Sequence, residues 1–223
     1  MPKTFVTGEE TLAQKAHRQL RRRIIDGRLR PGQRLPLRPL ASEMGMSMAP
    51  VGEALRELAR DGILETEPGW GARVRRLDSD ALRNQHILRT ALECEAIRHC
   101  TARIAESQRR ELAGLAGELD RRIDRHQDWK QVFELDSQFH LLIAERSGVR
   151  ALVEALRANQ LVRMLARGSL MAQHCEQPRR QHLSLVEAIS TRDPQIAEQA
   201  MREHCLRSME LQISQFAANP SGI

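Results

Sequence analysis

From Ser79 to the end of the sequence, apolar residues recur every three or four positions, and no segment reads convincingly as a strand. This spacing places the apolar residues of each segment along one face of a helix. Gly148 and the pair Asp193-Pro194 interrupt the pattern, because glycine and proline end helices. The sequence therefore predicts a bundle of six or more helices, over residues 79–105, 107–126, 128–147, 149–170, 176–191 and 194–217.

The first third of the chain has shorter elements. Apolar residues at helical spacing run from Thr11 to Asp26. Two short helices are predicted next, from about Leu37 to Met44 and from Met48 to Arg60. Gly45 ends the first of them, and Ser47 is a natural N-cap for the second. Two short helices joined by a tight turn with glycine are typical of a helix-turn-helix, whose second helix lies in the major groove.

A β-hairpin is predicted directly after these helices. Residues 63–67 (ILETE) and 72–76 (ARVRR) alternate, or nearly alternate, apolar and polar residues around the glycine-rich stretch PGWG. Such a hairpin is the wing of a winged helix-turn-helix. Gly69 would let its tip approach a groove closely. The return strand carries three arginines that could reach backbone phosphates: Arg73, Arg75 and Arg76.

The predicted fold is mainly α, in two domains. Residues 1–76 form a winged helix-turn-helix of three helices plus a small β-hairpin, and residues 77–223 form an all-α effector-binding bundle. The net charge of +6 lies wholly in the first domain, which carries 15 Lys and Arg against nine Asp and Glu, whereas the second carries 20 of each. A basic domain suits nucleic acid, anionic lipid or simple solubility, so its charge alone does not decide between these partners.

Two further features bear on partners. The first helix has a basic outer face that either contacts phosphates or is simply a solvated surface, and the sequence leaves both interpretations open: Arg18, Arg21, Arg22 and Arg23. No apolar run approaches the length that crosses a bilayer, and the first ten residues lack the apolar stretch of a secretory signal. We therefore expect a cytoplasmic protein without a membrane partner.

Histidines on apolar helix faces indicate a candidate site in the second domain. His140, His182 and His204 fall on apolar helix faces, and Asp136 lies four residues before His140, on the same face. A single buried histidine is usually a hydrogen-bonded core residue, but four such groups on three helices favour a metal site. Three imidazoles and one carboxylate suit a divalent transition metal (Zn, Ni, Mn or Fe, with Zn favoured), and leave coordination positions for water or an anion.

These residues resemble a known family. The segment from Leu29 to Thr66, LRPGQRLPLRPLASEMGMSMAPVGEALRELARDGILET, is similar to the DNA-binding part of GntR-type transcription regulators. RTALECEAIR, DSQFH, QHLSLVEAI and AMREHCL are similar to the helical part of the FadR-like subgroup, which carries an FCD effector domain. The ordered set of D-x-x-x-H followed by two separate histidines is specific, and the resemblance covers nearly the whole chain.

The resemblance implies a regulator rather than an enzyme. Such proteins are homodimers that bind palindromic double-stranded operator DNA, and a small organic acid, a carboxylate metabolite, alters their DNA affinity. The four metal ligands of the family match Asp136, His140, His182 and His204. Arg89 matches an arginine that faces the effector cavity and pairs with the ligand carboxylate, although its spacing also suits an ordinary helical pair with Glu93.

We expect nine residues at the DNA, of which Arg38 matches a DNA-contacting arginine of the family: Arg38, Ser47, Met48, Ala49, Pro50, Gly52, Arg56, Gly69 and Arg73. Related proteins usually carry arginine where this chain has Met48 and Gly52, and arginine is the commonest reader of guanine. We therefore predict DNA binding, and leave open whether these two residues weaken or redirect recognition.

Two alternative functions remain at this point. One is a metal-dependent enzyme, such as a hydrolase, that uses an open coordination position to activate water. It lacks a recognisable general base and leaves the basic wing unexplained. The other is a winged-helix protein that has lost specific DNA reading, which Met48 and Gly52 favour.

Overall fold

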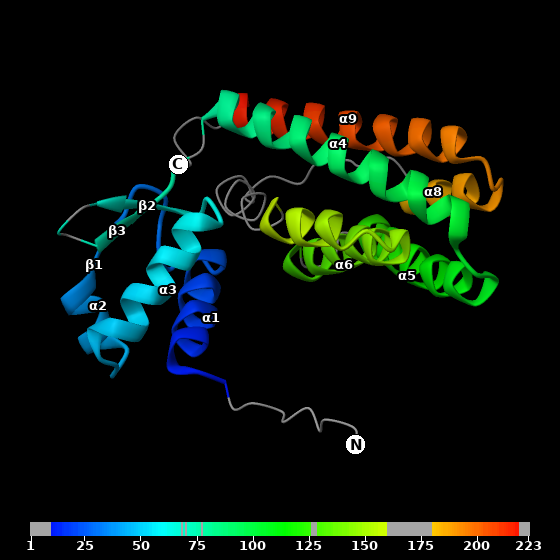
Figure 1. Cartoon of the computed structure of the whole chain (residues 1–223). Helices are drawn as coiled ribbons and strands as arrows, with labels where there is room; N and C mark the ends of the chain where they lie inside the picture. The colour runs from blue at the N-terminus through cyan, green and yellow to red at the C-terminus, as the bar shows by residue number, and fades with distance from the viewer. Residues whose placement is uncertain are drawn as a thin grey trace, which may run out of the picture. The chain divides into compact units, whose positions relative to one another are not determined.

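The computed structural model describes residues 10–67, 69, 71–76, 78–125, 129–159 and 180–218. They fall into two compact units that divide after Arg76. Helices make up most of both units, and a small antiparallel sheet belongs to the first (Figure 1). The predicted fold class, a winged helix-turn-helix followed by an all-helical domain, is confirmed.

Three helices form the body of the first unit: α1 (Leu12–Ile25), α2 (Leu37–Glu43) and α3 (Met48–Arg60). A capping box starts α1. The Thr11 hydroxyl accepts from the Gln14 backbone N–H at 3.2 Å, while the Gln14 side chain accepts from the Thr11 N–H at 2.9 Å. α1 packs against α3, and both bury apolar residues there, so these two helices hold the core of the unit.

The turn between α2 and α3 has the geometry of a helix-turn-helix. Gly45 follows α2 with a φ of +64°, a left-handed conformation that glycine adopts without steric cost. The Met46 N–H donates to the Ala41 carbonyl at 3.0 Å, which satisfies the end of α2. Ser47 occupies the N-cap position of α3 as predicted, but its hydroxyl forms no capping hydrogen bond. The backbone therefore makes this turn without help from that side chain.

The wing has three strands: β1 (Arg34–Pro36), β2 (Leu64–Glu67) and β3 (Gly71–Val74), in the order β1-β3-β2 with both pairs antiparallel. The hairpin of β2 and β3 was predicted, whereas β1 was not recognised as a strand. β1 pairs Pro36 with Gly71. A side chain at Gly71 would collide with the Leu35 carbonyl oxygen, and the φ there is +122°. Glycine therefore allows the third strand to approach so closely.

We expect Gly52→Ala to raise the free energy of unfolding by about 0.5–1 kcal/mol, because glycine inside a helix is less favourable than alanine. An added Cβ would lie 3.7 Å from the nearest atoms of Arg56 and Leu37, an ordinary contact distance. Urea unfolding measures the change. Gly71→Ala is the control and should destabilise the domain. Destabilisation by Gly52→Ala would contradict the prediction and show that α3 does not tolerate a side chain at this position.

The second unit is entirely helical in its described residues. Its elements are α4 (Ser79–Arg103), α5 (Glu106–Asp124), α6 (Trp129–Ser147), a helical segment through 150–159, α8 (Gln181–Ser190) and α9 (Pro194–Ala218). α4 and α9 lie side by side, α6 packs against α4 and α5, and α8 packs against α5 and α9 (Figure 1). The predicted continuation of the fourth helix to residue 170, and the start of the fifth at 176, lie outside the described residues.

The core of this unit is apolar but encloses charged groups. Leu112, Leu119, Phe139, Ile143 and Leu185 are almost completely buried together. Several ionisable side chains are buried beside them: Arg89, Glu93, Asp120, Asp136, His140, His182 and His204. Charged side chains are rarely buried unless they are paired, so this concentration makes the region the candidate functional site of the bundle. Among the described residues, no helix is long and apolar enough to cross a membrane.

Candidate metal centre and DNA-facing residues

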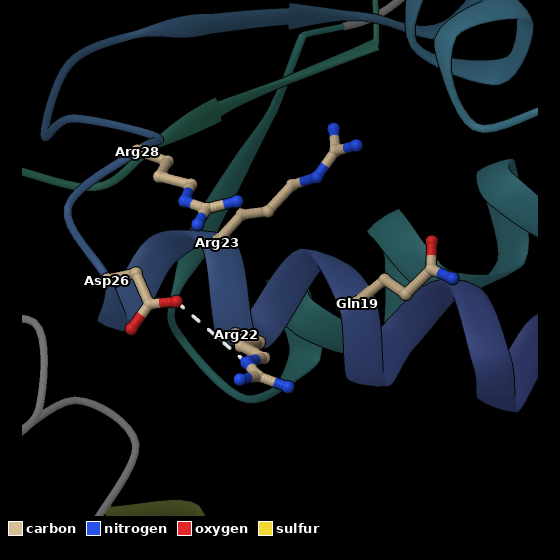
Figure 2. Close-up of a pocket in the computed structure, with 5 residues that line it drawn as sticks. All are labelled: Gln19, Arg22, Arg23, Asp26 and Arg28. Atoms are coloured by element: carbon tan, nitrogen blue, oxygen red, sulfur yellow. Dashed lines mark ion pairs between the residues drawn. The ribbon is translucent and has the colours of Figure 1, made fainter.

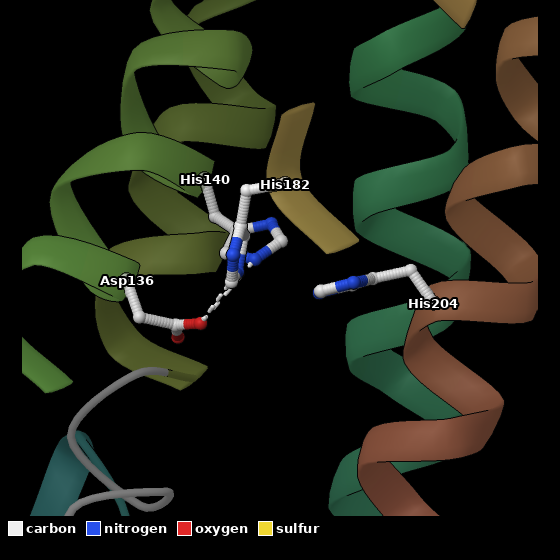
Figure 3. A group of neighbouring side chains, drawn as sticks. All are labelled: Asp136, His140, His182 and His204. Carbon is white, nitrogen blue, oxygen red and sulfur yellow. Dashed lines mark hydrogen bonds and ion pairs between the residues drawn. The ribbon is translucent and has the colours of Figure 1, made fainter. Parts of the chain in front are cut away.

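The four residues predicted as metal ligands lie together in the structure. α6 supplies Asp136 and His140, α8 supplies His182, and α9 supplies His204 (Figure 3). Each offers one nitrogen or oxygen atom, and these four atoms lie within 4.8 Å of one another. All four residues are buried. Side chains from three helices therefore converge on one small volume, as the helical spacing in the sequence indicated.

The carboxylate of Asp136 lies between two of the imidazoles. Its Oδ1 is 3.3 Å from Nε2 of His182 and 3.7 Å from Nε2 of His140. The ring of His204 is the same distance from both other rings, with centroids 5.0 Å apart in each case. The donors thus surround a common point instead of forming a row along one helix.

Two further carboxylates contact the outer nitrogens of these rings. Oδ1 of Asp120 lies 2.7 Å from Nδ1 of His182. Oε2 of Glu93 lies 2.8 Å from Nδ1 of His140, at hydrogen-bond distance but off the line of the N–H bond. Sequence analysis missed the role of Asp120. The signal was present, because an aspartate four residues after the buried Ala116 lies on the apolar face of α5.

Arg89 is 1% exposed and reaches three of its neighbours. Its Nε donates to Glu93 Oε1 at 2.6 Å, Nη1 donates to the Ser208 hydroxyl at 3.2 Å, and Nη2 lies 3.2 Å from Nε2 of His140. The ordinary helical pair with Glu93 is therefore present, and the same guanidinium also borders the histidine cluster. Burial lowers the pKa of Arg89, but Glu93, Cys205 and Asp136 together outweigh burial and raise the pKa, so the guanidinium stays charged.

Two of the three imidazole rings have a lowered pKa and are therefore in the neutral form that binds a metal ion. Burial lowers the pKa of His204 well below its ordinary value, and the neighbouring His140 and His182 lower it further. Burial also lowers the pKa of His140, against the opposing effect of Glu93. For His182, burial lowers the pKa, but hydrogen bonds with Asp120 and Asp136 outweigh it and raise the pKa. His140 and His204 are thus neutral at pH 7, which is the protonation state in which an imidazole binds a metal.

The donor set fits a divalent transition metal. Imidazole nitrogens with one carboxylate oxygen are ligands of Zn²⁺, Ni²⁺, Mn²⁺ and Fe²⁺. In addition, Nδ1 of the buried His204 has no hydrogen-bond partner among the described residues. A buried polar atom without a partner is uncommon and destabilising, and a bound ion or ligand is one explanation for it.

The predicted DNA-facing residues differ in exposure. Pro50 is half-buried at the start of α3. The exposed ones are Arg38, Ser47, Met48, Ala49, Arg56 and Gly69. Gly52 is buried against Leu37, so it presents no surface of its own. Arg73 is half-buried, and its Nη1 lies 3.4 Å from the Gly32 carbonyl oxygen.

One residue on this surface was not among the predicted contacts. Glu53 is exposed on α3, four residues after Ala49 and three before Arg56, so the three share one face. A carboxylate there repels phosphates but can accept a hydrogen bond from the N4 amino group of cytosine. The candidate DNA surface of α3 is therefore less basic than the net charge of the domain indicates.

The basic face of α1 is largely paired with acids. Arg18 contacts Glu10 at 2.6 Å and Arg23 contacts Glu43 at 2.8 Å. Figure 2 shows a pocket at the end of this helix, in which Arg22 lies 3.9 Å from Asp26. The pocket is lined by Gln19, Arg22, Arg23, Asp26 and Arg28. Of the two interpretations left open above, these ion pairs favour a solvated, charge-balanced face.

Comparison with known proteins places the chain in a family. Residues 12–74 match the family model described as bacterial regulatory proteins, gntR family, and residues 86–207 match that of the FCD domain. This chain belongs to the GntR family and carries an FCD domain. The GntR match covers the helix-turn-helix and wing, and the FCD match covers Arg89 and all four candidate metal ligands.

Relatives with names support the same conclusion for this GntR protein. The HTH-type transcriptional repressor RspR of Escherichia coli K12 is 29% identical over 208 residues, which cover 90% of this chain and 89% of RspR. The uncharacterised regulator YdfH of Escherichia coli O6:H1 is 30% identical over 198 residues, covering 86% and 84% of the two chains. The protein is a transcriptional regulator of the GntR family.

Solved structures agree in fold. E. coli McbR/YncC superposes with a TM-score of 0.77 at 23% identity, covering 92% of this chain and 99% of that one. A GntR regulator from Rhodococcus sp. RHA1 gives a TM-score of 0.71 at 23% identity, covering 91% and 97%. At this level of identity the likeness concerns the fold alone.

Proposed function

We propose that this GntR protein is a homodimeric repressor that binds a palindromic double-stranded operator, and that a small carboxylate bound beside a metal ion in the FCD domain changes its DNA affinity. Within the family we assign it to the FadR-like subgroup, and we expect no enzymatic activity. The observation that supports this proposal most directly is the convergence of Arg89 with the Asp136–His140–His182–His204 cluster in one buried site. The relative RspR is itself named a repressor.

The chemistry of the site suits a carboxylate. Asp136, His140, His182 and His204 would hold the ion, with Zn²⁺ favoured over Ni²⁺, Mn²⁺ and Fe²⁺. A bound ion supplies a positive charge and open coordination positions for an anionic oxygen. The charged guanidinium of Arg89 lies beside it, and its planar donors match the geometry of a carboxylate.

Ligand binding can alter DNA affinity only if the ligand prefers one of two states of the dimer. Arg89 lies in α4, which begins only three residues after the DNA-binding unit ends at Arg76. We propose that the ligand fixes α4 and thereby the spacing of the two DNA-binding domains. Ile87 and Leu88 are 60% and 48% exposed on α4, and a second copy of the chain would cover such apolar residues.

For the DNA surface, we propose that arginines contact phosphates and that the start of α3 lies at the bases. Arg38, Arg56 and Arg73 are the candidate phosphate contacts, with Gly69 at the tip of the wing. The candidate base contacts are Ser47, Met48, Ala49 and Pro50, since the first residues of a recognition helix approach the base edges. Gly52 is buried, so we propose that it does not read a base.

Fluorescence anisotropy with labelled duplexes tests the proposal. The protein should bind its own promoter more tightly than random DNA, with two chains per operator, and its affinity should fall as salt rises. Arg38→Ala and Arg56→Ala should each weaken binding and reduce the slope of log K against log salt by about 1, because each removes one phosphate contact. Adding carboxylates to the metal-loaded protein should change the promoter affinity.

Arg110→Ala is the matched control, since Arg110 is an exposed arginine of the second unit. Its salt slope should equal that of the wild type. Equal affinity for promoter and random DNA would contradict operator recognition, and a promoter affinity insensitive to every metal and carboxylate combination would contradict ligand control.

A further inference from the structure

Asp120 has an unusual number of partners for a side chain that no part of the proposed function uses. It lies in α5 and is 4% exposed. Oδ1 accepts from Nδ1 of His182 at 2.7 Å, and Oδ2 accepts from the backbone N–H of Leu183 at 3.0 Å and of His182 at 3.2 Å. The carboxylate of Asp120 therefore accepts hydrogen bonds from both the ring and the backbone of His182.

The start of α8 explains the backbone contacts. Arg180 stands at the N-cap position in a left-handed conformation, with φ +55°, and offers no side-chain cap. The first N–H groups of a helix need partners from elsewhere. Asp120, about 60 residues earlier in the chain, supplies them and places a negative charge at the positive end of the helix. α8 is thus anchored to α5 at the turn that carries His182.

The ring contact decides which nitrogen of His182 faces the cluster. A carboxylate only accepts hydrogen bonds, so the hydrogen on Nδ1 points at Asp120. Nε2 is then the atom directed at Asp136, 3.3 Å from its Oδ1.

We propose that Asp120 is a positioning residue for the metal centre: it holds the ring of His182 so that Nε2 faces Asp136, and it fixes the first turn of α8 at the same time. This inference rests on the metal site proposed above. Carboxylate partners of a ligating histidine fix its tautomer and orientation and raise its basicity, and their loss lowers metal affinity. Asp120 would thus set the affinity without touching the ion.

Asp120→Asn tests this role, because it keeps the size of the side chain but removes the charge and one acceptor oxygen. Zinc affinity is measured by competition with a chromophoric chelator at fixed pH. We expect a 10- to 100-fold loss, about the effect known for such partners. In the zinc-loaded protein, the exchangeable Nδ1 proton of His182, seen by one-bond ¹H–¹⁵N correlation, should exchange faster with water than in the wild type.

Asp124→Asn, an exposed aspartate of the same helix, is the control and should bind zinc as the wild type does. Asp120→Glu restores the charge and should recover part of the affinity, which also covers the case in which Asp120→Asn does not fold. If Asp120→Asn binds zinc as tightly as the wild type and its Nδ1 proton is unchanged, the role of Asp120 is wrong while the metal site stands. If the wild type binds no zinc, the metal site itself falls, and Asp120 keeps only its capping contacts.

Discussion

Replacing His182 or His204 by alanine is expected to lower zinc affinity by about 100-fold or more, since loss of a ligand exceeds the 10- to 100-fold effect of losing a ligand's hydrogen-bond partner. Each substitution removes one of four donors that lie within 4.8 Å of one another. Metal analysis of the purified proteins and chelator competition both measure the change. We expect the wild type to bind zinc far more tightly than either variant.

His99→Ala is the matched control for these variants. His99 is an exposed histidine on α4 that pairs with Glu95 at 2.8 Å and lies outside the cluster. It should keep the full metal content of the wild type. Equal metal content in the wild type, His182→Ala and His204→Ala would overturn the assignment of the four ligands.

Arg89→Ala should lower the free energy of unfolding by about 3–5 kcal/mol, the usual cost of removing one partner from a buried ion pair. The substitution leaves the carboxylate of Glu93 buried without the guanidinium that lies 2.6 Å away. It also opens a cavity where a large, fully buried side chain stood. Urea unfolding in the presence of a chelator isolates this effect from any contribution of bound metal.

Arg98→Ala on the same helix provides the comparison. Arg98 also pairs with a glutamate of α4, Glu95 at 2.8 Å, but both side chains are exposed. Exposed pairs contribute little, so its unfolding curve should overlie that of the wild type. Similar curves for Arg89→Ala and Arg98→Ala would show that Glu93 is stabilised without the guanidinium and that Arg89 is dispensable for the fold.

Local sequence signals were sufficient to predict most helices and strands and the four residues of the buried cluster. Helical spacing of apolar residues predicted the bundle, and the bounds of α3, Met48 to Arg60, agree with the structure. His140 and His182 were recognised because a polar residue on an apolar helix face stands out in a single segment. Asp136 follows from its spacing to His140. Each of these inferences needs only one element at a time.

Features that depend on two distant segments could not be predicted in this way. β1 is only three residues long and exists because it pairs with β3, to which Gly71 gives access. Asp120 and His182 are 62 residues apart, and nothing near either residue specifies the other. Likewise, Glu93 was considered only as the helical neighbour of Arg89, whereas it also contacts the ring of His140. Tertiary packing determines all three.

The separation of the ligands along the chain has a consequence for synthesis in the cell. Asp136 and His140 leave the ribosome together, but His204 lies in α9 and emerges more than sixty residues later. A nascent chain that stops before α9 carries an incomplete donor set and leaves the apolar side of α4 without its partner helix. The complete donor set of the proposed metal site therefore exists only after residue 204 has been synthesised.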